Sequence, residues 1–486
     1  MKETAIVSGA PRMTDAVIAA AIGASLRAAV VLWAAPRFPP AEDGHFYHIV
    51  AGRMAAGQGY TWLWPDGSVT FAAHYPVGYP AVLAGLYALL GGPVAPAAML
   101  FNAVLGSVAV FAVHRVVASG GSRLSALLAS LAVAVHPGLV MYTPALMTEG
   151  VTAALLAMSA WCAVATRSAR SKEQWKWLFG LGVLMGVTAL VRPESLLLAP
   201  VFGALAASGS EPGTGEPRPR WCRLRASAWV FGIALGTCSP WTVRNCLRMD
   251  RCVLLSANGG WNLYIGSMPE GNGGWVPIEG ESVPPACRRV FGEANKDICF
   301  ARAARERILA HSLSWLRLIP QKLAATFDYS GASAFYLQAS NPRELGAEAK
   351  LRLGLLETGA DRMLVLAALL AVLRLDGPQR QWRSLVCAAS LPWLFLRWAW
   401  LSWLGVVFGA ALLGRRMNQR LAVPFAASVI ALTALVHAVF FGAGRYSLVC
   451  IPLLAALAAL VVEPRDKLDD RSARNPTAAQ RLPRVV

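Results

Sequence analysis

Charge is scarce in this sequence. Only 15% of its 486 residues are charged and 56% are hydrophobic, whereas soluble domains average about 25% charged residues. Soluble domains built from this chain would lack the polar surface to cover themselves, which excludes a soluble enzyme, a disordered protein and a receptor with a single anchor. The apolar runs 126–135 and 453–462 lie within stretches near the roughly 20 residues that cross a bilayer. The sequence therefore predicts an all-α polytopic membrane protein.

Zinc-binding cysteine patterns and internal repeats are also lacking. The nine cysteines include no CxxC pair and no zinc spacing. We find no solenoid-type repeat and no inverted symmetry of the kind that many transporters carry. Four cysteines gather in one long polar loop, where Cys246 and Cys252, or Cys287 and Cys299, can form disulfides if the loop is exported. Four cysteines allow three pairings, and the sequence leaves them open.

The positions of the basic residues, which give the chain a net charge of +18, indicate the topology. A nucleic-acid partner would require Lys and Arg clustered on a soluble face, but here they stand in short patches between apolar runs. We therefore expect no nucleic acid as a partner. Keeping these patches on the cytoplasmic side predicts about twelve spans with both termini inside. A bacterial inner membrane is the expected location, with membrane lipids as surroundings.

The predicted spans and loops follow from that sidedness. We expect the first apolar segment, 16–35, to be an uncleaved signal-anchor, and 77–90, short for a span, to be a juxtamembrane helix. Further spans are expected at 95–117, 124–141, 150–166, 177–191, 194–207 and 226–241, followed by four or five more. The transmembrane domain would cover 1–462, with external loops at 36–94 and 242–358 and a disordered cytoplasmic tail at 463–486.

Counting the predicted spans along the chain places a set of polar residues on the outer face. Ionisable groups near span ends are costly unless they are paired or line a wet cavity, so these residues are candidates for function. The alternative is that they are ordinary interfacial residues in loops. The set comprises Glu42, Asp43, His45, His74, Tyr75, Glu149, Arg192, Glu194, Arg244, Arg445 and Tyr446.

The adjacent carboxylates Glu42 and Asp43 are the sharpest local feature of this set. They can accept a proton from a hydroxyl or amine nucleophile, or bind a divalent cation together with Glu149. A third interpretation is a solvated helix N-cap, because Asp is a preferred cap.

The outward arginines indicate what these carboxylates act on. Guanidinium groups match phosphate geometry, and a phosphate at a membrane edge is expected to belong to a lipid. The alternative for Arg445 is an arginine that snorkels to lipid headgroups. In the long loop, 258–264 and 271–275 are rich in Gly, Asn and aromatic residues, which suits a sugar-binding surface, although plain turn chemistry gives the same pattern. The stretch 298–318 is amphipathic, as for a helix along a membrane surface.

The order of five short motifs resembles the GT-C superfamily of membrane glycosyltransferases, in particular the family 39-like group that includes protein O-mannosyltransferases and the lipid A aminoarabinose transferase. The resemblance covers about residues 15–462. The motifs are Glu42-Asp43 with Tyr47 and Gly57-Gln58-Gly59-Tyr60; His74-Tyr75-Pro76-Val77-Gly78-Tyr79-Pro80; Thr148-Glu149; Pro240-Trp241-Thr242-Val243-Arg244-Asn245; and Gly442–Tyr446.

This resemblance implies a helical bundle with juxtamembrane helices and a polyprenyl-phosphate sugar as donor. It implies that Asp43 is the catalytic base, that Glu149 shapes the site and that Arg445-Tyr446 matches a family Arg-Tyr pair. Family members often carry two prolines after the histidine, from which His74-Tyr75-Pro76 departs.

Together the residues and the resemblance predict a hexosyl or pentosyl transfer at the outer, periplasmic face, with inversion, to a lipid, glycan or protein acceptor. Asp43 would take the proton of the acceptor. Other residues would bind the substrates: Glu42, His74, Tyr75, Glu149, Arg192, Arg244, Arg445 and Tyr446. The sequence leaves the need for a metal open. The alternative is a membrane transporter or lipid flippase, for which the mid-span Arg27 is the nearest support, since a transporter would place ionisable residues near the midplane.

Overall fold

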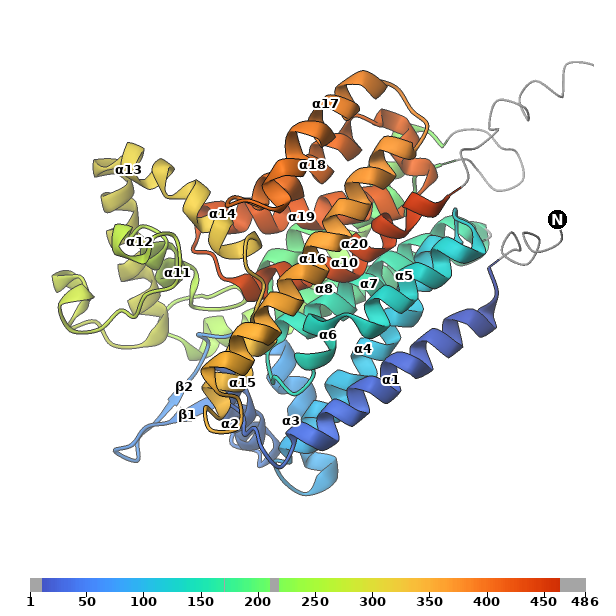
Figure 1. The fold of residues 1–486 in the computed structure, drawn as a ribbon. Helices are drawn as coiled ribbons and strands as arrows, with labels where there is room; N and C mark the ends of the chain where they lie inside the picture. The colour runs from blue at the N-terminus through green and yellow to red at the C-terminus, as the bar shows by residue number, and fades with distance from the viewer. Residues whose placement is uncertain (1–10, 170, 210–217, 464–486) are drawn as a thin grey trace, which may run out of the picture.

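The computed structural model describes residues 11–169, 171–209 and 218–463. Helices dominate this part of the chain (Figure 1), which confirms the predicted all-α class. Its strands are β1 (Thr61–Leu63) and β2 (Val69–Phe71), an antiparallel hairpin with Thr61 opposite Phe71. Apart from Glu463, the predicted tail 463–486 lies outside the described residues, as do the first ten residues.

Six helical segments of the described chain are long and apolar enough to cross a membrane. They are α1 (Met13–Ala34), α4 (Ala95–Ala118), α7 (Thr148–Ser168), Lys172–Val191 within α8 (Ser171–Val191), α19 (Ala422–Val439) and Gly444–Val462, which contains α20 (Ile451–Ala458). Shorter apolar helices are α3 (Gly78–Leu90), α5 (Arg123–Val135), Pro193–Ala206 and α18 (Trp400–Ala411). The predicted count of about twelve spans is thus not confirmed and stays a prediction.

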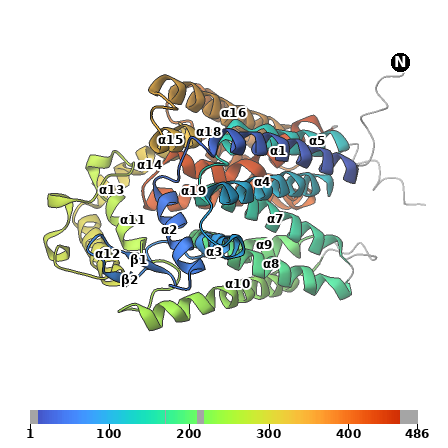
Figure 2. The same cartoon turned by 90° about the horizontal axis from the view of Figure 1, so that it is seen from below.

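The long helices form one bundle in which early and late helices of the described chain pack together. α1 packs against α4 and α5, and the late helix α20 packs against α4, α5 and α16 (Ala347–Arg374). α10 (Arg220–Arg248) runs along the edge of the bundle beside α8 and α9 (Ala199–Ala206), as Figure 2 shows from below. The largest buried cluster is rich in Ala, Val and Leu, and such small side chains let helices approach closely.

A domain that we call the outer domain lies at the end of the bundle far from the start of α1 (Figure 1). Its disulfides join Cys246 to Cys252 and Cys287 to Cys299, which is one of the three pairings that the sequence leaves open. The helices here, and those that connect them to the bundle, are α2 (Asp43–Ala55), α11 (Gly259–Ile265), α12 (Glu293–Ala310), α13 (Ser312–Arg317), α14 (Ile319–Phe327) and α15 (Ala332–Ser340).

Three predicted spans differ from the helices in the structure. The expected span 124–141 is divided into α5 and α6 (Pro137–Met141), because Pro137 has no N–H to continue the helix. The expected span 194–207 is a 3₁₀ helix, Pro193–Leu198, followed by α9. The expected span 226–241 is the middle of α10, whose arginine-rich ends extend it to 29 residues. α10 reaches Arg248 and α16 starts at Ala347, and the expected external loop 242–358 stays a prediction.

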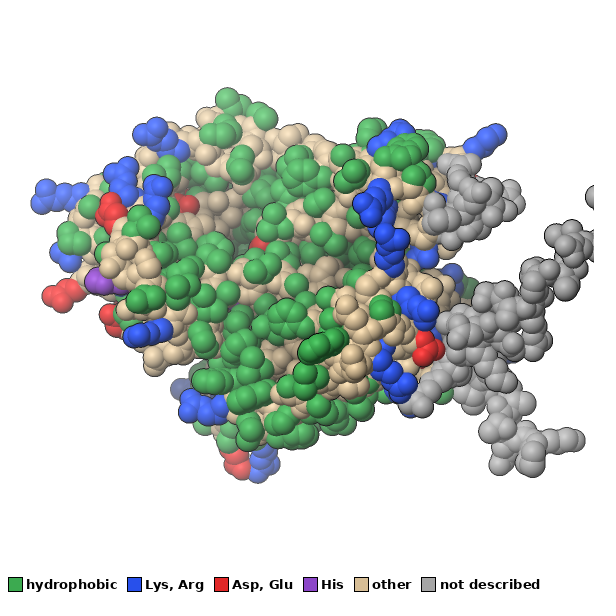
Figure 3. Space-filling view, turned by 90° about the horizontal axis from the view of Figure 1, so that it is seen from above, with side chains coloured by type: hydrophobic (Ala, Val, Ile, Leu, Met, Phe, Trp, Pro, Cys, Tyr) green, Lys and Arg blue, Asp and Glu red, His purple; other side chains and the backbone are tan. Residues whose placement is uncertain are grey.

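Charge is distributed as a membrane protein requires. In Figure 3 apolar side chains form a broad central band, while Lys and Arg gather toward the two ends. α17 (Arg380–Ser390) carries basic residues at its start. The band agrees with a bundle that sits in the bilayer, where exposed side chains contact hydrocarbon.

Buried cations inside the molecule cap the carboxyl ends of helices. Lys322 Nζ donates to Ala438 O and Val439 O, at 3.3 and 2.9 Å, at the end of α19. Arg383 Nη1 donates to Val372 O and Leu375 O, at 2.6 and 2.7 Å, at the end of α16. The last carbonyls of a helix have no partner within the helix and carry partial negative charge. Each cation therefore satisfies carbonyls that would otherwise be orphaned.

Candidate functional site

A cavity of about 570 Å³ lies where the bundle meets the outer domain. We call it the outer cavity. Its volume falls within the roughly 300–1,000 Å³ of ligand sites. The segments that line it are far apart in the sequence: the start of α2, the loop 74–76, the start of α7, 191–197, 254–262, the end of α19 and 440–446. Seven of the predicted site residues line it: Asp43, His74, Tyr75, Glu149, Arg192, Arg445 and Tyr446.

Asp43 is the first residue of α2 and is held by two partners. Its Oδ1 accepts a hydrogen bond from the hydroxyl of Tyr75 at 2.7 Å. Its Oδ2 lies 3.1 Å from Arg445 Nη2. The carboxylate is therefore oriented from both sides, and its side chain stays 23% exposed, so a substrate hydroxyl can reach it.

Glu149 forms the buried centre of the charge cluster. It stands in the first turn of α7 and is 2% exposed. Its Oε1 lies 3.1 Å from Arg192 Nη1 and 3.3 Å from Arg445 Nε, while its Oε2 accepts from the hydroxyl of Tyr142 at 3.0 Å. Arg445 consequently bridges Asp43 and Glu149, which are 106 residues apart in the sequence. Burial of such a carboxylate is tolerated because it is paired on both oxygens.

Arg192 ties this cluster to the opposite wall of the cavity. Its Nε donates to Glu194 Oε1 at 2.7 Å, and its guanidinium lies 5.1 Å from the ring centre of Tyr446. Tyr446 in turn stacks on His437, with ring centres 4.0 Å apart. Burial opposes the charge of Arg192, but the carboxylates of Glu194 and Glu149 outweigh it and raise its pKa. Arg192 is thus a permanent cation at this wall.

His74 and Tyr75 form the side of the cavity that belongs to the first external loop. The backbone N–H of His74 donates to Glu293 Oε2 at 2.7 Å, which anchors the loop to α12. Burial lowers the pKa of the His74 imidazole, against the opposing effect of Asp43. Burial and the charge of Asp43 raise the pKa of the Tyr75 phenol. At neutral pH Tyr75 therefore keeps the proton that it donates to Asp43.

The third wall combines amides, indoles and apolar side chains. Asn258, Trp261, Asn262 and Trp275 line it, so the Gly/Asn/Trp stretch predicted to suit sugars does reach the cavity. Trp261 is fixed edge-to-face against Phe300, with ring centres 4.6 Å apart. The apolar part comes from the end of α19 and from the 3₁₀ helix after Arg192: Leu196, Leu197, Val436, Phe440 and Phe441.

Two predicted substrate-binding residues lie away from the outer cavity. Glu42 is exposed, has a left-handed φ of 51° and is not among the lining residues. Arg244 donates to the carbonyls of Ala72 and Tyr60, at 2.8 and 2.7 Å. It therefore holds the backbone of the first external loop, two residues before His74.

Sequence reasoning missed several residues of this site. Tyr142 and His437 lie near predicted loops, but a lone Tyr or His next to a span gives no signal of its own. Glu293 was hidden for the same reason, although its carboxylate holds the backbone N–H of His74. Tyr142 and Glu149 stand seven residues apart, at the two ends of a predicted external turn. This spacing is the sequence signal that could have predicted their contact.

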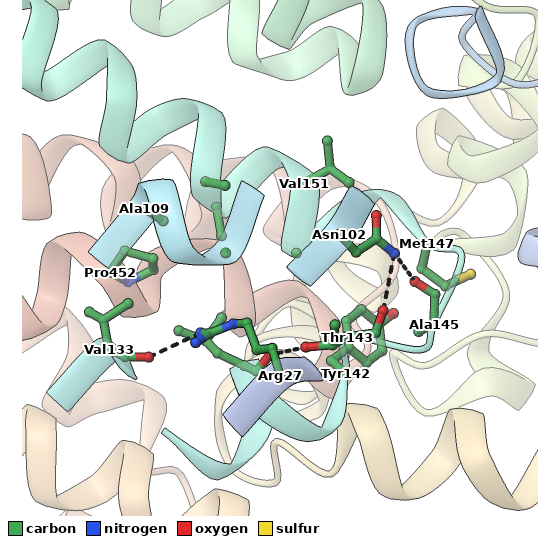
Figure 4. A pocket seen from close by; sticks show the side chains of 15 residues that line it. Arg27, Asn102, Ala109, Val133, Tyr142, Thr143, Ala145, Met147, Val151 and Pro452 are labelled. Carbon is green, nitrogen blue, oxygen red and sulfur yellow. Dashed lines mark hydrogen bonds between the residues drawn. The ribbon is translucent and has the colours of Figure 1, made fainter. Parts of the chain in front are cut away.

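Arg27 lies apart from the outer cavity, beside a small enclosed one in the middle of the bundle (Figure 4). It is 2% exposed, and its guanidinium donates to Val133 O at 3.1 Å and to Ala134 O at 3.3 Å. Within the described ranges it has no carboxylate partner. It caps α5 at the break before Pro137, and Gly106 makes room for it, since a Cβ there would lie 2.4 Å from Arg27 Nε. About 30 Å³ of space remains, which holds roughly one water.

Metal-ligand geometry is not present in the described part of the chain, where no group of three or more His, Cys, Asp and Glu side chains could hold a metal ion. Asp43 and Glu149, two of the carboxylates expected to bind a divalent cation, both contact Arg445. The cation therefore stays a prediction.

Comparison with known families places this site in context. Residues 74–241 match the family described as dolichyl-phosphate-mannose-protein mannosyltransferase. Over this stretch the match agrees with the predicted resemblance to the protein O-mannosyltransferase group. The matched stretch covers less than half of the chain and contains His74, Tyr75, Glu149 and Arg192. No curated protein sequence matches the chain.

Solved structures with a similar arrangement of helices include two enzymes. The apo oligosaccharyltransferase of Archaeoglobus fulgidus matches 92% of this chain and 50% of its own, at 12% identity and a TM-score of 0.48. ArnT of Cupriavidus metallidurans, bound to undecaprenyl phosphate, matches 91% of this chain and 77% of its own, at 15% identity and a TM-score of 0.37. The chain spans about half the length of the archaeal enzyme.

Proposed function

We propose that this chain is an integral membrane glycosyltransferase that moves a hexosyl or pentosyl group from a polyprenyl-phosphate donor to an acceptor at the outer face of a bacterial inner membrane. The observation that carries the proposal is that Asp43 and Arg445 meet, 3.1 Å apart, in a cavity that also has an apolar wall. A base, a phosphate-binding cation and a surface for a lipid chain are therefore supplied by one site. Both chain termini would be cytoplasmic.

The donor fits the chemistry of two walls. Arg445 and Arg192 present guanidinium groups whose donors match phosphate oxygens. The apolar part of the third wall, formed by Val436, Phe440 and Phe441, suits the first isoprene units. The polar part of the same wall, with Asn258 and Trp261, offers amides and a ring face to the sugar.

The reaction would be a single inverting displacement. The acceptor oxygen or nitrogen attacks the anomeric carbon while the bond from that carbon to the phosphate oxygen breaks. Asp43 Oδ takes the proton of the acceptor, and the polyprenyl phosphate leaves with its added negative charge stabilised by Arg445 and Arg192. Tyr75 and Glu149 position these groups, the first through its hydrogen bond to Asp43 and the second through both arginines. The acceptor would be a lipid, a glycan or a protein.

The test is a transfer assay on purified protein in liposomes. The donors are polyprenyl-phosphate hexoses and pentoses, an envelope extract supplies acceptors, and mass spectrometry follows released polyprenyl phosphate. We expect Asp43→Asn to lower the rate about 10²–10⁴-fold, and its exposed neighbour Glu42→Gln to stay within about twofold.

Two results would overturn the proposal. The first is a folded Asp43→Asn protein with undiminished transfer. The second is wild-type protein that consumes no donor but moves a labelled lipid across the bilayer, which is the behaviour of a transporter or flippase.

A further inference from the structure

A second cavity, of about 640 Å³, lies in the outer domain between α12–α13 and the segment after α11. α11 contributes to both cavities: Trp261 and Asn262 line the outer cavity, and Tyr264 lines the second one. The second cavity has the size of a ligand site, and the reaction proposed above makes no use of it.

The lining of the second cavity combines ring faces with groups that donate and accept hydrogen bonds. Tyr264 and Trp315 supply the rings, Arg307 and His311 donate, and Glu306 accepts. Sugars present the complementary surface, because their C–H faces pack on rings while each hydroxyl both donates and accepts. An apolar chain would leave these polar groups unpaired at a cost.

Three of the lining side chains, Tyr264, Arg307 and Trp315, are held in place before any ligand arrives. Arg307 lies 5.1 Å from the ring centre of Tyr264 and donates to its hydroxyl at 3.3 Å, and this hydroxyl donates to Ser282 O at 3.1 Å. Lys322 Nζ lies 4.8 Å from the ring centre of Trp315. Trp315 therefore offers its ring to the cavity. Such preorganisation lowers the entropic cost of binding.

The second cavity is also mechanically continuous with the reacting groups. Tyr264 shares a buried cluster with Phe441 and Tyr446. The backbone N–H of Gly442 donates to Gly273 O at 2.8 Å. Tyr264, which lines the second cavity, therefore packs in the same cluster as residues of the segment that carries Arg445.

We propose that the second cavity binds a saccharide portion of the acceptor, remote from the group that receives the sugar. This inference rests on the proposed function, since it names the acceptor as a glycan or glycolipid. Binding energy from a remote part of a substrate holds the reacting part in place and raises the rate.

The experiment measures binding directly, without transfer. Manno-, chito- and galacturono-oligosaccharides of two to four units are titrated calorimetrically into wild-type protein in nanodiscs. We expect at least one to bind, and Trp315→Ala and Arg307→Ala each to weaken its affinity about tenfold or more. The matched controls are the exposed Arg305→Ala on the same helix and Trp382→Ala on α17, which should leave the affinity unchanged. Thermal melting of each variant checks that it is folded.

Two outcomes overturn the inference: wild-type protein that binds none of these saccharides, or binding that survives in folded Trp315→Ala and Arg307→Ala but is lost in Trp261→Ala, which would place the ligand in the outer cavity. The result is independent of the transfer assay. Saccharide binding without donor consumption would refute the proposed function and leave only a saccharide site in the second cavity, whereas donor consumption without saccharide binding would refute this inference alone.

Discussion

Arginines occupy two contrasting settings in this molecule. Arg445, in the outer cavity, contacts two carboxylates, those of Asp43 and Glu149. Arg27, in the middle of the bundle, hydrogen-bonds within the described residues to backbone carbonyls alone, and the space beside it holds roughly one water. The partners differ in what they allow. A guanidinium that pairs with a carboxylate side chain can exchange it for a phosphate, because the two anions offer similar hydrogen-bond geometry. The backbone carbonyls at the end of α5 are fixed in the helix, so Arg27 has no such exchange.

The difference teaches how to interpret a buried cation in a membrane protein. An ionisable residue in a span is a functional candidate by default, and by that rule Arg27 favoured a transporter. Its contacts instead make it the cap of a helix broken by Pro137, as Lys322 and Arg383 cap α19 and α16. Burial of a cation is therefore not by itself evidence of function, and the group that the cation contacts is the better guide.

Of the changes that test this comparison, the one at Arg445 has the largest expected effect. Replacing it by Gln removes charge stabilisation from the leaving phosphate and should lower transfer per folded molecule about 10²–10³-fold. Arg445→Lys, which keeps the charge but loses the fork, should retain an intermediate rate. Initial rates at saturating donor measure this. Equal rates for Arg445→Gln and wild type would remove the distinction between the two arginines.

Arg27 should affect stability instead. Arg27→Leu leaves the carbonyls of Val133 and Ala134 without their partner, at a cost of about 1–3 kcal/mol for each buried group. Thermal melting in nanodiscs should show the loss, while transfer per folded molecule stays within about twofold. Arg27→Lys should recover part of the stability. A folded, normally stable Arg27→Leu protein with abolished transfer would assign Arg27 to the chemistry.

A smaller effect is expected at Tyr142, which lines the Arg27 cavity and holds Glu149. Tyr142→Phe deletes one hydrogen bond, which contributes about 0.5–1.5 kcal/mol, so transfer should fall roughly two- to tenfold. Because Glu149 positions both arginines, we expect the loss at subsaturating donor. The ratio of kcat/KM values measures it, and Tyr87→Phe, whose hydroxyl contacts His48 instead, serves as the control. An unchanged donor kcat/KM would show that Arg192 and Arg445 suffice to hold Glu149.

The smallest expected effect is the pH dependence of the outer region. Burial lowers the pKa of folded His74, so folding favours the neutral imidazole. The stability that this contributes is complete above the unfolded pKa of about 6.5 and is lost as pH falls toward the folded pKa. Melting at about pH 7.5 and about pH 5.5 should therefore show a smaller acid destabilisation in His74→Asn than in wild type. Identical shifts would contradict a neutral, buried His74.

Much of this structure could be predicted from where charge stands in the sequence. Sidedness alone placed Asp43, Glu149, Arg192 and Arg445 on one face, and they meet in one cavity. The break at Pro137 and the turn from Arg192 into a 3₁₀ helix were missed, because apolar content does not distinguish a straight span from an interrupted one. The same limit applied to Arg244, since a sequence does not reveal whether an arginine meets a ligand or, as here, the carbonyls of Ala72 and Tyr60.

The most direct test of the outward cluster is the binding of its proposed phosphate ligand. Undecaprenyl phosphate would be titrated into wild type, Arg445→Gln and Arg27→Gln in the same nanodiscs. Hydrogen bonds to charged groups contribute about 1.5–3 kcal/mol, so we predict affinity at least about tenfold weaker in Arg445→Gln and unchanged in Arg27→Gln. Equal affinity in all three proteins, or a loss confined to Arg27→Gln, would contradict the assignment of phosphate binding to the outer cavity.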